Sequence, residues 1–297
     1  MSTGITLAAI GCSGPVAHHF VEGFATEGVA LKMLARNPAA INLRYPDAQV
    51  VQGSMMNPDD VAGVVAGADA GFLVTPMGMN NDPSTEIEAA RRALAGMSAA
   101  GLPHLVYTSC LGVDRTQGVG ILDAKHEIER LIRDSGIPFS ILRCGTYMED
   151  LFDPRLELLK KGKFLFPLHR RRRFTFTSQR DIPRFAVREL IAKGQALGRA
   201  IDLVAPGTWL IPEIEQLLAE TAGFKIKAPP RFPTFHIFRA LLPFFRLRKD
   251  RMSSVIPLLV HFDSHGYLSP DPVPYDGNFE MTSLEDHVQS LFAQSIG

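Results

Sequence analysis

Two glycines near the start of the chain stand at a spacing that could bind phosphate. In IGCSGPVAHHF (10–20), Gly11, Gly14 and Ala17 follow an apolar run in the pattern Gly-x-x-Gly-x-x-Ala. Gly11 would permit a sharp turn, Gly14 would let backbone N–H groups approach phosphate oxygens, and Ala17 would let a helix pack closely on the strand. The positive end of that helix favours a pyrophosphate. A plain tight turn between a strand and a helix is the alternative interpretation.

Arg36 is a second residue with a chemical role, and it ends the next apolar run, in ARNP (35–38). In a dinucleotide-binding fold this position lies beside the adenosine ribose, where an acidic side chain would accept from a free 2′-hydroxyl. A guanidinium is suited to a 2′-phosphate instead. Arg36 therefore predicts NADP(H) in preference to NAD(H), with a solvated cation at a strand end as the alternative.

Lys125 is the candidate for proton chemistry. It follows Asp123, which we expect to cap a helix over 123–136, so Lys125 would lie in the first helical turn. The helix N-terminus and partial desolvation would both disfavour the ammonium form. We therefore expect a lowered pKa and a proton donor or acceptor. The alternatives are a surface lysine or one that only holds a ribose hydroxyl.

Ser109 and Cys110 end another apolar run, where active-site residues of parallel sheets commonly lie. Ser109 could hydrogen-bond a substrate or a nicotinamide amide, although a serine at a strand end often caps its own backbone. Cys110 has no basic partner at a suitable spacing, so we interpret it as a small buried thiol.

We expect no metal site. The three cysteines are far apart in the sequence and show no metal-ligand spacing, which fits a reducing compartment. His18 and His19 are interpreted as ordinary helix residues, without metal partners four residues further on.

Short apolar runs and amphipathic segments alternate around these residues. The runs, rich in Val, Ile, Leu and Phe, predict strands at 5–11, 29–36, 48–53, 71–75, 104–110 and 139–144. Helices are predicted between them, most clearly at 84–101 and 123–136. Such alternation predicts right-handed crossovers and a doubly wound α/β fold, with a parallel sheet covered by helices on both faces.

The pattern changes after Tyr147. We divide the chain into a cofactor-binding domain at 1–150 and a smaller region at 151–297 that binds substrate and packs on the first. The second region contains predicted helices at 150–161 and 211–222 and a strand at 200–206, which we expect to return to the sheet.

The overall charge argues against several classes of partner. Lys and Arg together number 31, as do Asp and Glu, so neither nucleic acid nor a membrane surface is expected. The run HRRRRF (169–174) is interpreted as solvated charge on a turn. No apolar run reaches membrane length and no signal sequence is evident, which favours a cytoplasmic protein. A homodimer is compatible with the sequence.

A series of motifs resembles the NmrA-like and isoflavone-reductase-like proteins, atypical members of the short-chain dehydrogenase/reductase superfamily. The matching segments include IGCSGPVA (10–17), LARNP (34–38), VVQGSMMNPDDVAGVVAGADAGFLVTP (50–76), AAGLPHLVYTSCLGVD (99–114), AKHEIERLIRDSGIPFSILRCGTYMEDL (124–151) and FTFTSQRDIPRFA (174–186). They run in order along nearly the whole chain. The resemblance implies a Rossmann-like, NAD(P)-binding fold.

The resemblance also implies site residues. The cofactor would be bound by Gly11, Ser13, Gly14, Pro15, Val16, Arg36, Met55, Thr75, Pro76, Lys125 and Tyr147. Lys125 falls where the isoflavone-reductase-like branch has its catalytic lysine, and we add Ser109 as a second catalytic candidate. The substrate would be lined by Tyr147 and Met148, and by Phe235 and Phe238 of an aromatic C-terminal stretch that covers the substrate in this family. That stretch is also compatible with a core helix or a membrane-surface helix.

Three departures from the family pattern matter. The usual Gly-Ala-Thr-Gly-x-x-Gly turn is Gly-Cys-Ser-Gly-Pro-Val-Ala here. Ser54 replaces the usual aspartate after Gly53, which removes one adenine contact and leaves Met55 as a packing partner. Ile121 stands four residues before Lys125, so the Tyr-x-x-x-Lys pair of ordinary short-chain dehydrogenases is absent. This argues against a tyrosine-based ketone reductase, and equally against epimerase or dehydratase chemistry.

These observations predict an NADPH-dependent reductase of a small aromatic or phenolic substrate. The nicotinamide would supply the hydride and Lys125 would handle the proton. The substrate classes are a conjugated enone, a lignan-type benzylic ether or a quinone. The alternative is a non-catalytic, NAD(P)-binding redox sensor that controls a partner protein, in which Lys125 only positions the ribose.

Overall fold

The computed structural model describes residues 3–14, 17–75, 82–164, 170–192, 197–226, 240–241, 243, 251–269 and 279–293. Its centre is a seven-stranded sheet of β1 (Thr6–Ile10), β2 (Ala30–Ala35), β3 (Gln49–Gln52), β4 (Ala70–Leu73), β5 (Leu105–Cys110), β6 (Phe139–Cys144) and β10 (Arg199–Leu203). The strand order is β10-β6-β5-β4-β1-β2-β3, and every neighbouring pair is parallel. The predicted doubly wound fold is confirmed. The strand order reverses between β1 and β4, the point where such sheets bind ligands.

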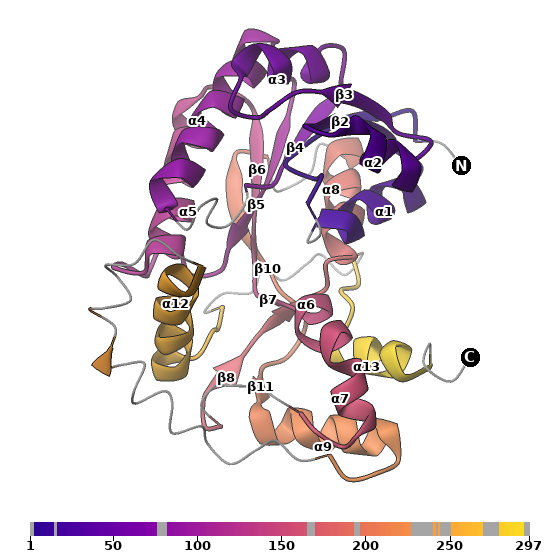
Figure 1. Ribbon diagram of the computed structural model, residues 1–297, viewed down its shortest axis with the longest axis vertical. Coiled ribbons are helices and arrows are strands. Elements are labelled where there is room, and N and C mark those ends of the chain that lie inside the picture. Colours follow the sequence, from indigo (N-terminus) through magenta and orange to yellow (C-terminus); the bar gives the residue numbers. More distant parts are fainter. Residues whose placement is uncertain are drawn as a thin grey trace.

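Helices cover both faces of this sheet (Figure 1). They are α1 (His18–Thr26), α2 (Pro38–Arg44), α3 (Pro58–Val65), α4 (Pro83–Ala99), α5 (Gly120–Asp134) and α8 (Asp181–Ala192). On the α1 and α8 side, Phe72 of β4 meets Phe20 and Phe24 of α1 edge to face, at ring-centroid distances of 5.6 and 4.9 Å. The opposite core joins β4 and β5 to α3, α4 and α5. Because both faces are buried, the central strands β1 and β4 are apolar rather than alternating, whereas the edge strand β3 (QVVQ) has an exposed glutamine at each end.

Helix α5 begins earlier than the sequence predicts. It starts at Gly120 with Val119 as its N-cap, and Asp123 lies inside its first turn. The Asp123 carboxylate still accepts a backbone hydrogen bond, but from Gly118, at 3.1 Å. Lys125 therefore lies in the second turn of the helix, not in the first.

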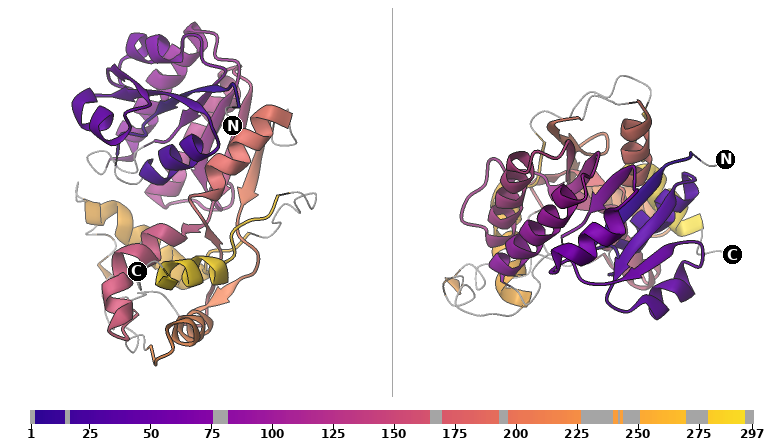
Figure 2. Two further views of the ribbon diagram at one scale, coloured as in Figure 1. Left: turned by 90° about the vertical axis from the view of Figure 1, so that its right-hand side faces the viewer. Right: turned by 90° about the horizontal axis from the view of Figure 1, so that it is seen from above.

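The second region lies at the carboxyl ends of the strands (Figures 1 and 2). Its elements are β7 (Thr146–Tyr147), α6 (Met148–Phe152), the 3-10 helix η3 (Asp153–Arg155), α7 (Leu156–Lys160), β8 (Arg173–Phe174), β9 (Phe176–Thr177), β11 (Trp209–Leu210), α9 (Ile211–Ala222), α12 (Arg251–His265) and α13 (Leu284–Ala293). It has an apolar core of its own, which includes Phe152, Phe164 and Phe174. The strand expected at 200–206 is β10, which pairs with β6 in the central sheet. None of the described helices is long and apolar enough to cross a membrane.

Two arginines of the HRRRRF run have carboxylate partners on α9. Arg170 pairs with Glu215, and Arg173 lies 3.0 Å from Glu213. These ion pairs were not predicted for the run, although the side chains of Arg170 and Arg173 keep 38% and 43% of their surface exposed.

Candidate active site

The turn between β1 and α1 has the geometry of a phosphate-binding loop. Gly11 has a φ of +79°, and a side chain at this position would collide with the backbone carbonyl of Val74. Only glycine meets both demands. A Cβ added to Gly14 would meet no atom within 4 Å, so open space lies beside the backbone of the turn. Ala17 is 2% exposed and lets α1 pack against the sheet. Pro15 and Val16 lie outside the described residues.

A cavity of about 220 Å³ continues from this turn across the ends of β2 and β3. Its lining includes five of the residues predicted to bind cofactor: Gly11, Ser13, Gly14, Arg36 and Met55. It also includes Leu34, Gly53, Ser54 and Met56. Residues from three separate loops of the sequence thus meet at one edge of the sheet.

Arg36 is exposed at the rim of this cavity. Within the described part of the chain its guanidinium has neither an ion pair nor a hydrogen bond. The side chain is therefore available to an anion in the cavity.

The Gly53–Ser54 corner is held by Asp60 of α3. The Asp60 carboxylate accepts from the Ser54 backbone N–H at 2.9 Å, and Ser54 Oγ accepts from the Met56 N–H at 3.2 Å. A side chain at residue 53 would come within 2.7 Å of Asp60 Cβ. The serine that replaces the family's usual aspartate thus shapes the corner and leaves no carboxylate at position 54 itself.

Lys125 belongs to a buried group of four polar side chains, which we call the Lys125 cluster: Thr75, Glu86, Tyr107 and Lys125. The Lys125 ammonium donates to Thr75 Oγ1 at 2.7 Å, to the Thr75 carbonyl at 3.4 Å, and lies 3.0 Å from Glu86 Oε1. Thr75 Oγ1 in turn donates to Glu86 at 2.7 Å, so Tyr107, 3.1 Å away, must be the donor in its contact with Thr75. All four side chains are at most 4% exposed.

The expected lowering of the Lys125 pKa is wrong. Burial is the largest single influence and acts in the predicted direction. The negative charge of Glu86, its hydrogen bond with the ammonium, and the neighbouring Tyr107 and Cys110 together outweigh burial and hold the pKa of Lys125 above its usual value. Each ammonium proton also has an acceptor in Thr75 or Glu86. Lys125 is therefore a permanent buried cation near neutral pH, which makes it a poor base and a poor acid.

The Lys125 cluster borders the phosphate-binding turn. Val74 donates its backbone N–H to Ile10 at the end of β1, and its carbonyl is the group that excludes a side chain at Gly11. Thr75 is the next residue. Lys125 consequently holds Thr75, and with it the backbone that follows β4 beside the β1–α1 turn. The hydroxyl of Thr75, which the family pattern assigns to cofactor binding, is used inside the Lys125 cluster. Pro76, the following predicted residue, lies outside the described residues.

Ser109 has a different partner from the one predicted. Its hydroxyl donates to the buried Glu129 of α5 at 2.8 Å. Glu129 also accepts from Arg143 of β6 at 2.7 and 2.9 Å and from Arg133 at 2.9 Å, and Arg143 reaches Asp114 at 2.7 Å. We call these five residues the Glu129 cluster. Ser109 is 2% exposed and its one proton is used inside this cluster.

Neighbouring residues are packed rather than reactive. Burial raises the pKa of Cys110 to about 11, so the thiol stays protonated near neutral pH. Tyr147 is partly buried with its ring 6.0 Å from that of Phe20, in edge-to-face contact with the cofactor helix α1. Met148, predicted to line the substrate, is 0% exposed in the core of the second region, because α6 begins there and packs against that core. Phe235 and Phe238 lie outside the described residues.

Glu86 and Tyr107 are the residues that the sequence analysis missed. Glu86 lies on the buried stripe of α4 with Ala89, Ala90 and Ala93, at the spacing i+3, i+4 and i+7. An acidic residue inside an apolar helical stripe signals a buried partner. That signal was available in the sequence, whereas the identity of the partner, 39 positions away on another helix, was not.

Comparisons with known proteins agree with this geometry. The NAD(P)H-binding family matches residues 11–190. The chain belongs to this family. The resemblance to NmrA-like and isoflavone-reductase-like proteins is confirmed at the level of the fold and of cofactor class.

Among the relatives, a (4-alkanoyl-5-oxo-2,5-dihydrofuran-3-yl)methyl phosphate reductase from Streptomyces griseus is 31% identical over 141 residues, which is 47% of either chain. Quinone oxidoreductase 2 from Escherichia coli is 24% identical over 223 residues, covering 74% of this chain and 76% of the relative. The crystal structure of an NADPH-dependent quinone oxidoreductase from Escherichia coli, complexed with NADPH, covers 96% of this chain and 99% of that one, with a TM-score of 0.76 and 21% identity.

Proposed function

We propose that the protein is an NADPH-dependent reductase of quinone-like aromatic acceptors. The binding of NADPH is proposed from the cavity beside the β1–α1 turn, which has Arg36 exposed at its rim. The reductase part rests on the named activities of the relatives.

The residues present suit a dinucleotide. Gly11, Ser13 and Gly14 would hold the pyrophosphate at the N-terminus of α1, where backbone N–H groups converge. Met55 and Met56 would offer apolar contact to an adenine ring from the floor of the cavity. When bound, NADPH supplies a hydride from its nicotinamide.

Arg36 favours the 2′-phosphorylated cofactor. A guanidinium donates several hydrogen bonds to a phosphate in a planar fork, and it carries its charge at every physiological pH. No acidic side chain stands at the end of β2 to accept from a free ribose hydroxyl. NADPH should therefore bind more tightly than NADH.

Lys125 is better suited to positioning than to proton transfer. Its three hydrogen bonds end on Thr75 and Glu86, and burial keeps it from solvent. We assign it the role of fixing Thr75, and through Val74 the turn at Gly11. A proton-donor role, expected from the family, would require this network to open during turnover.

This assignment bears on the substrate class. A quinone takes two electrons and one hydrogen from NADPH as a hydride, and one further proton completes the hydroquinone: quinone + NADPH + H⁺ gives hydroquinone + NADP⁺. That proton can come from water. A benzylic ether instead needs a proton delivered to its leaving oxygen as the C–O bond breaks. Because Lys125 is paired with Glu86, quinones are the substrate class that least requires a proton donor from this protein.

The test has two stages. Titration with NADPH and with NADH, followed by nicotinamide fluorescence, should show a preference for NADPH. Arg36→Ala should weaken NADPH binding about ten- to a hundred-fold and leave NADH nearly unchanged, since one charge-assisted phosphate contact is removed. Arg44→Ala, which removes an exposed arginine of α2 outside the cavity, is the matched control and should change neither affinity.

Turnover is then measured with NADPH and a panel of quinones, enones and benzylic ethers. Oxidation of NADPH with quinones alone supports the proposal. Tight NADPH binding without turnover of any class would contradict the reductase and favour a sensor. Absence of binding to either dinucleotide would contradict the cofactor assignment itself.

A further inference from the structure

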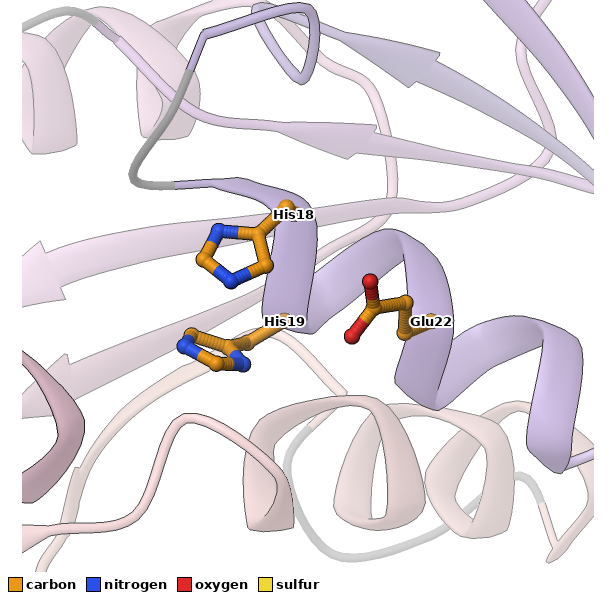
Figure 3. Close-up of side chains that lie close together, drawn as sticks. All are labelled: His18, His19 and Glu22. Atoms are coloured by element: carbon orange, nitrogen blue, oxygen red, sulfur yellow. The ribbon is translucent and has the colours of Figure 1, made fainter. Parts of the chain in front are cut away.

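Three side chains that can ligate a metal converge on the first turns of α1. The nitrogen ligands of His18 and His19 and a carboxylate oxygen of Glu22 all lie within 4.8 Å of one another. Figure 3 shows both imidazole rings on one side of the helix, one above the other and tilted by 40°, with the carboxylate beside them. The ring centroids are 3.7 Å apart. The expectation that these histidines lack a partner four residues on is wrong, because Glu22 stands at that spacing from His18.

We propose that His18, His19 and Glu22 form a binding site for a divalent transition-metal ion of the zinc class. Two imidazoles and one carboxylate are a common ligand set for Zn²⁺, whereas Mg²⁺ and Ca²⁺ prefer sites built from oxygen alone. A tetrahedral ion with bonds of about 2.0–2.1 Å holds its ligand atoms about 3.3 Å apart. Small rotations of the His18, His19 and Glu22 side chains would bring their ligand atoms from within 4.8 Å to about 3.3 Å of one another. The fourth position is left to water.

The surroundings favour a cation. Glu149 of α6 and Asp153 of η3 act electrostatically on His19, and Asp150 interacts with His18. These three carboxylates place negative charge beside the imidazoles in addition to Glu22. A divalent cation is attracted to such a site before any ligand bond forms.

The competing partner of Glu22 is weak. Arg44 of α2 lies 3.7 Å from Glu22, and both side chains are about half exposed, at 49% and 55%. An exposed ion pair of this kind contributes little, so a metal ion can displace it at small cost. His18 and His19 are partly buried, which limits the conformational entropy that ligation would have to remove.

The test uses the full chain without a polyhistidine tag, stripped of metal. Zn²⁺ is titrated in competition with a chromophoric chelator, and Co²⁺ absorption reports the coordination geometry. We expect one Zn²⁺ per chain, with intense Co²⁺ bands typical of four-coordinate ions. His19→Ala and Glu22→Gln should each weaken binding at least about ten-fold, since each removes one ligand of three. Arg44→Ala should strengthen it by releasing Glu22.

Two controls separate this site from incidental binding. Glu27→Gln removes a carboxylate from the residue that caps the same helix and should leave Zn²⁺ affinity unchanged. His261→Ala breaks the stacked His261–His265 pair on α12, whose rings lie 4.6 Å apart, and should also have no effect. A far-UV circular dichroism spectrum and a thermal unfolding midpoint close to those of the unsubstituted protein show that the ligand variants fold.

The proposal is overturned by absence of stoichiometric Zn²⁺ binding. It is equally overturned if binding survives both His19→Ala and Glu22→Gln, or if His261→Ala abolishes it.

Discussion

Helix α5 buries two opposite charges one turn apart, and the two are used differently. Lys125 faces a single carboxylate and the backbone and hydroxyl of Thr75. Glu129 faces two guanidinium groups and the hydroxyl of Ser109. Both charges are almost completely removed from water. Each would be costly to bury alone, and each is compensated by partners from other elements.

The difference lies in where the partners come from. The Lys125 cluster gathers residues from the end of β4, from α4 and from β5, next to the cofactor turn. The Glu129 cluster gathers residues from β5, from Asp114 in the loop that follows it, from β6 and from α5 itself, away from the cavity. Equal burial of charge therefore does not imply an equal role. We expect the Lys125 cluster to affect both stability and cofactor binding, and the Glu129 cluster to affect stability alone.

Lys125→Met should have the largest effect. It leaves Glu86 buried without a cation, and breaking a buried pair from one side costs about 3–5 kcal/mol of unfolding free energy. NADPH affinity should fall about ten-fold as Thr75 loses its anchor, equivalent to about 1.4 kcal/mol. Urea unfolding and cofactor titration measure the two effects.

The second substitution Glu86→Gln sharpens this test. When Glu86→Gln is added to Lys125→Met, it removes the buried carboxylate charge that Lys125→Met leaves unpaired. The double variant should regain at least about 1 kcal/mol of unfolding free energy relative to Lys125→Met, so the effects of the two substitutions are not additive. Strict additivity would mean that the two side chains do not interact in solution.

Glu129→Gln should cost about 2–3 kcal/mol of unfolding free energy, because among the described residues Arg143 keeps Asp114 as its one ion-pair partner. NADPH affinity should stay unchanged. Glu127→Gln on the same helix is the matched control: Glu127 pairs with the exposed Arg130, and its loss should change stability by less than about 1 kcal/mol. A loss of NADPH binding in Glu129→Gln would remove the distinction between the clusters.

Ser109→Ala should have a smaller effect, about 1–2 kcal/mol, because one hydrogen bond to a charged acceptor is lost. Turnover should not change. A fall in kcat without a fall in stability would instead favour the catalytic role first expected for Ser109.

The pH profile should show no effect of Lys125 at all between pH 6 and 10. Despite burial, Glu86 and the other polar groups around the ammonium hold the pKa of Lys125 in the folded state above the ordinary value of 10.5, so the ammonium stays charged across that window. The stabilising contribution of the Lys125 ammonium is fully present below the pKa that Lys125 has in the unfolded chain. It is lost only as the pH rises through the higher pKa that Lys125 has in the folded protein. A limb in kcat/KM that disappears in Lys125→Met would point to proton transfer by this lysine.

The sequence predicts the sheet well and the polar clusters poorly. The six strand positions of the first half agree with β1 to β6 within one or two residues, because their apolar runs are bounded by glycine, proline and asparagine. The start of α5 was placed late because Asp123 has the side chain of a good N-cap while Val119 does not. In the structure the Asp123 carboxylate accepts from the backbone N–H of Gly118, which has a φ of +78°, and the helix begins between the two residues.

Charge pairing was the harder problem. Burial of Lys125 could be inferred from its place on α5, but the direction of its pKa depended on Glu86, and that contact is created only by packing α4 against α5. Ser109 was misjudged for the same reason, since Glu129 and Arg143 meet only across two strands and a helix. His18 and Glu22 differ, because their spacing is local and was visible in the sequence.

The position of β10 has a consequence for how the chain matures. The last strand of the cofactor sheet is reached only after α6, α7, β8, β9 and α8 have been made, because β10 occupies residues Arg199–Leu203 and pairs with β6. In a nascent chain that does not yet include β10, strand β6 is an edge strand with unpaired backbone N–H and C=O groups. Part of the second region is therefore synthesised before the sheet of the first region is complete. In a circularly permuted chain that begins with the second region, β10 would be synthesised before β6, the strand with which it pairs.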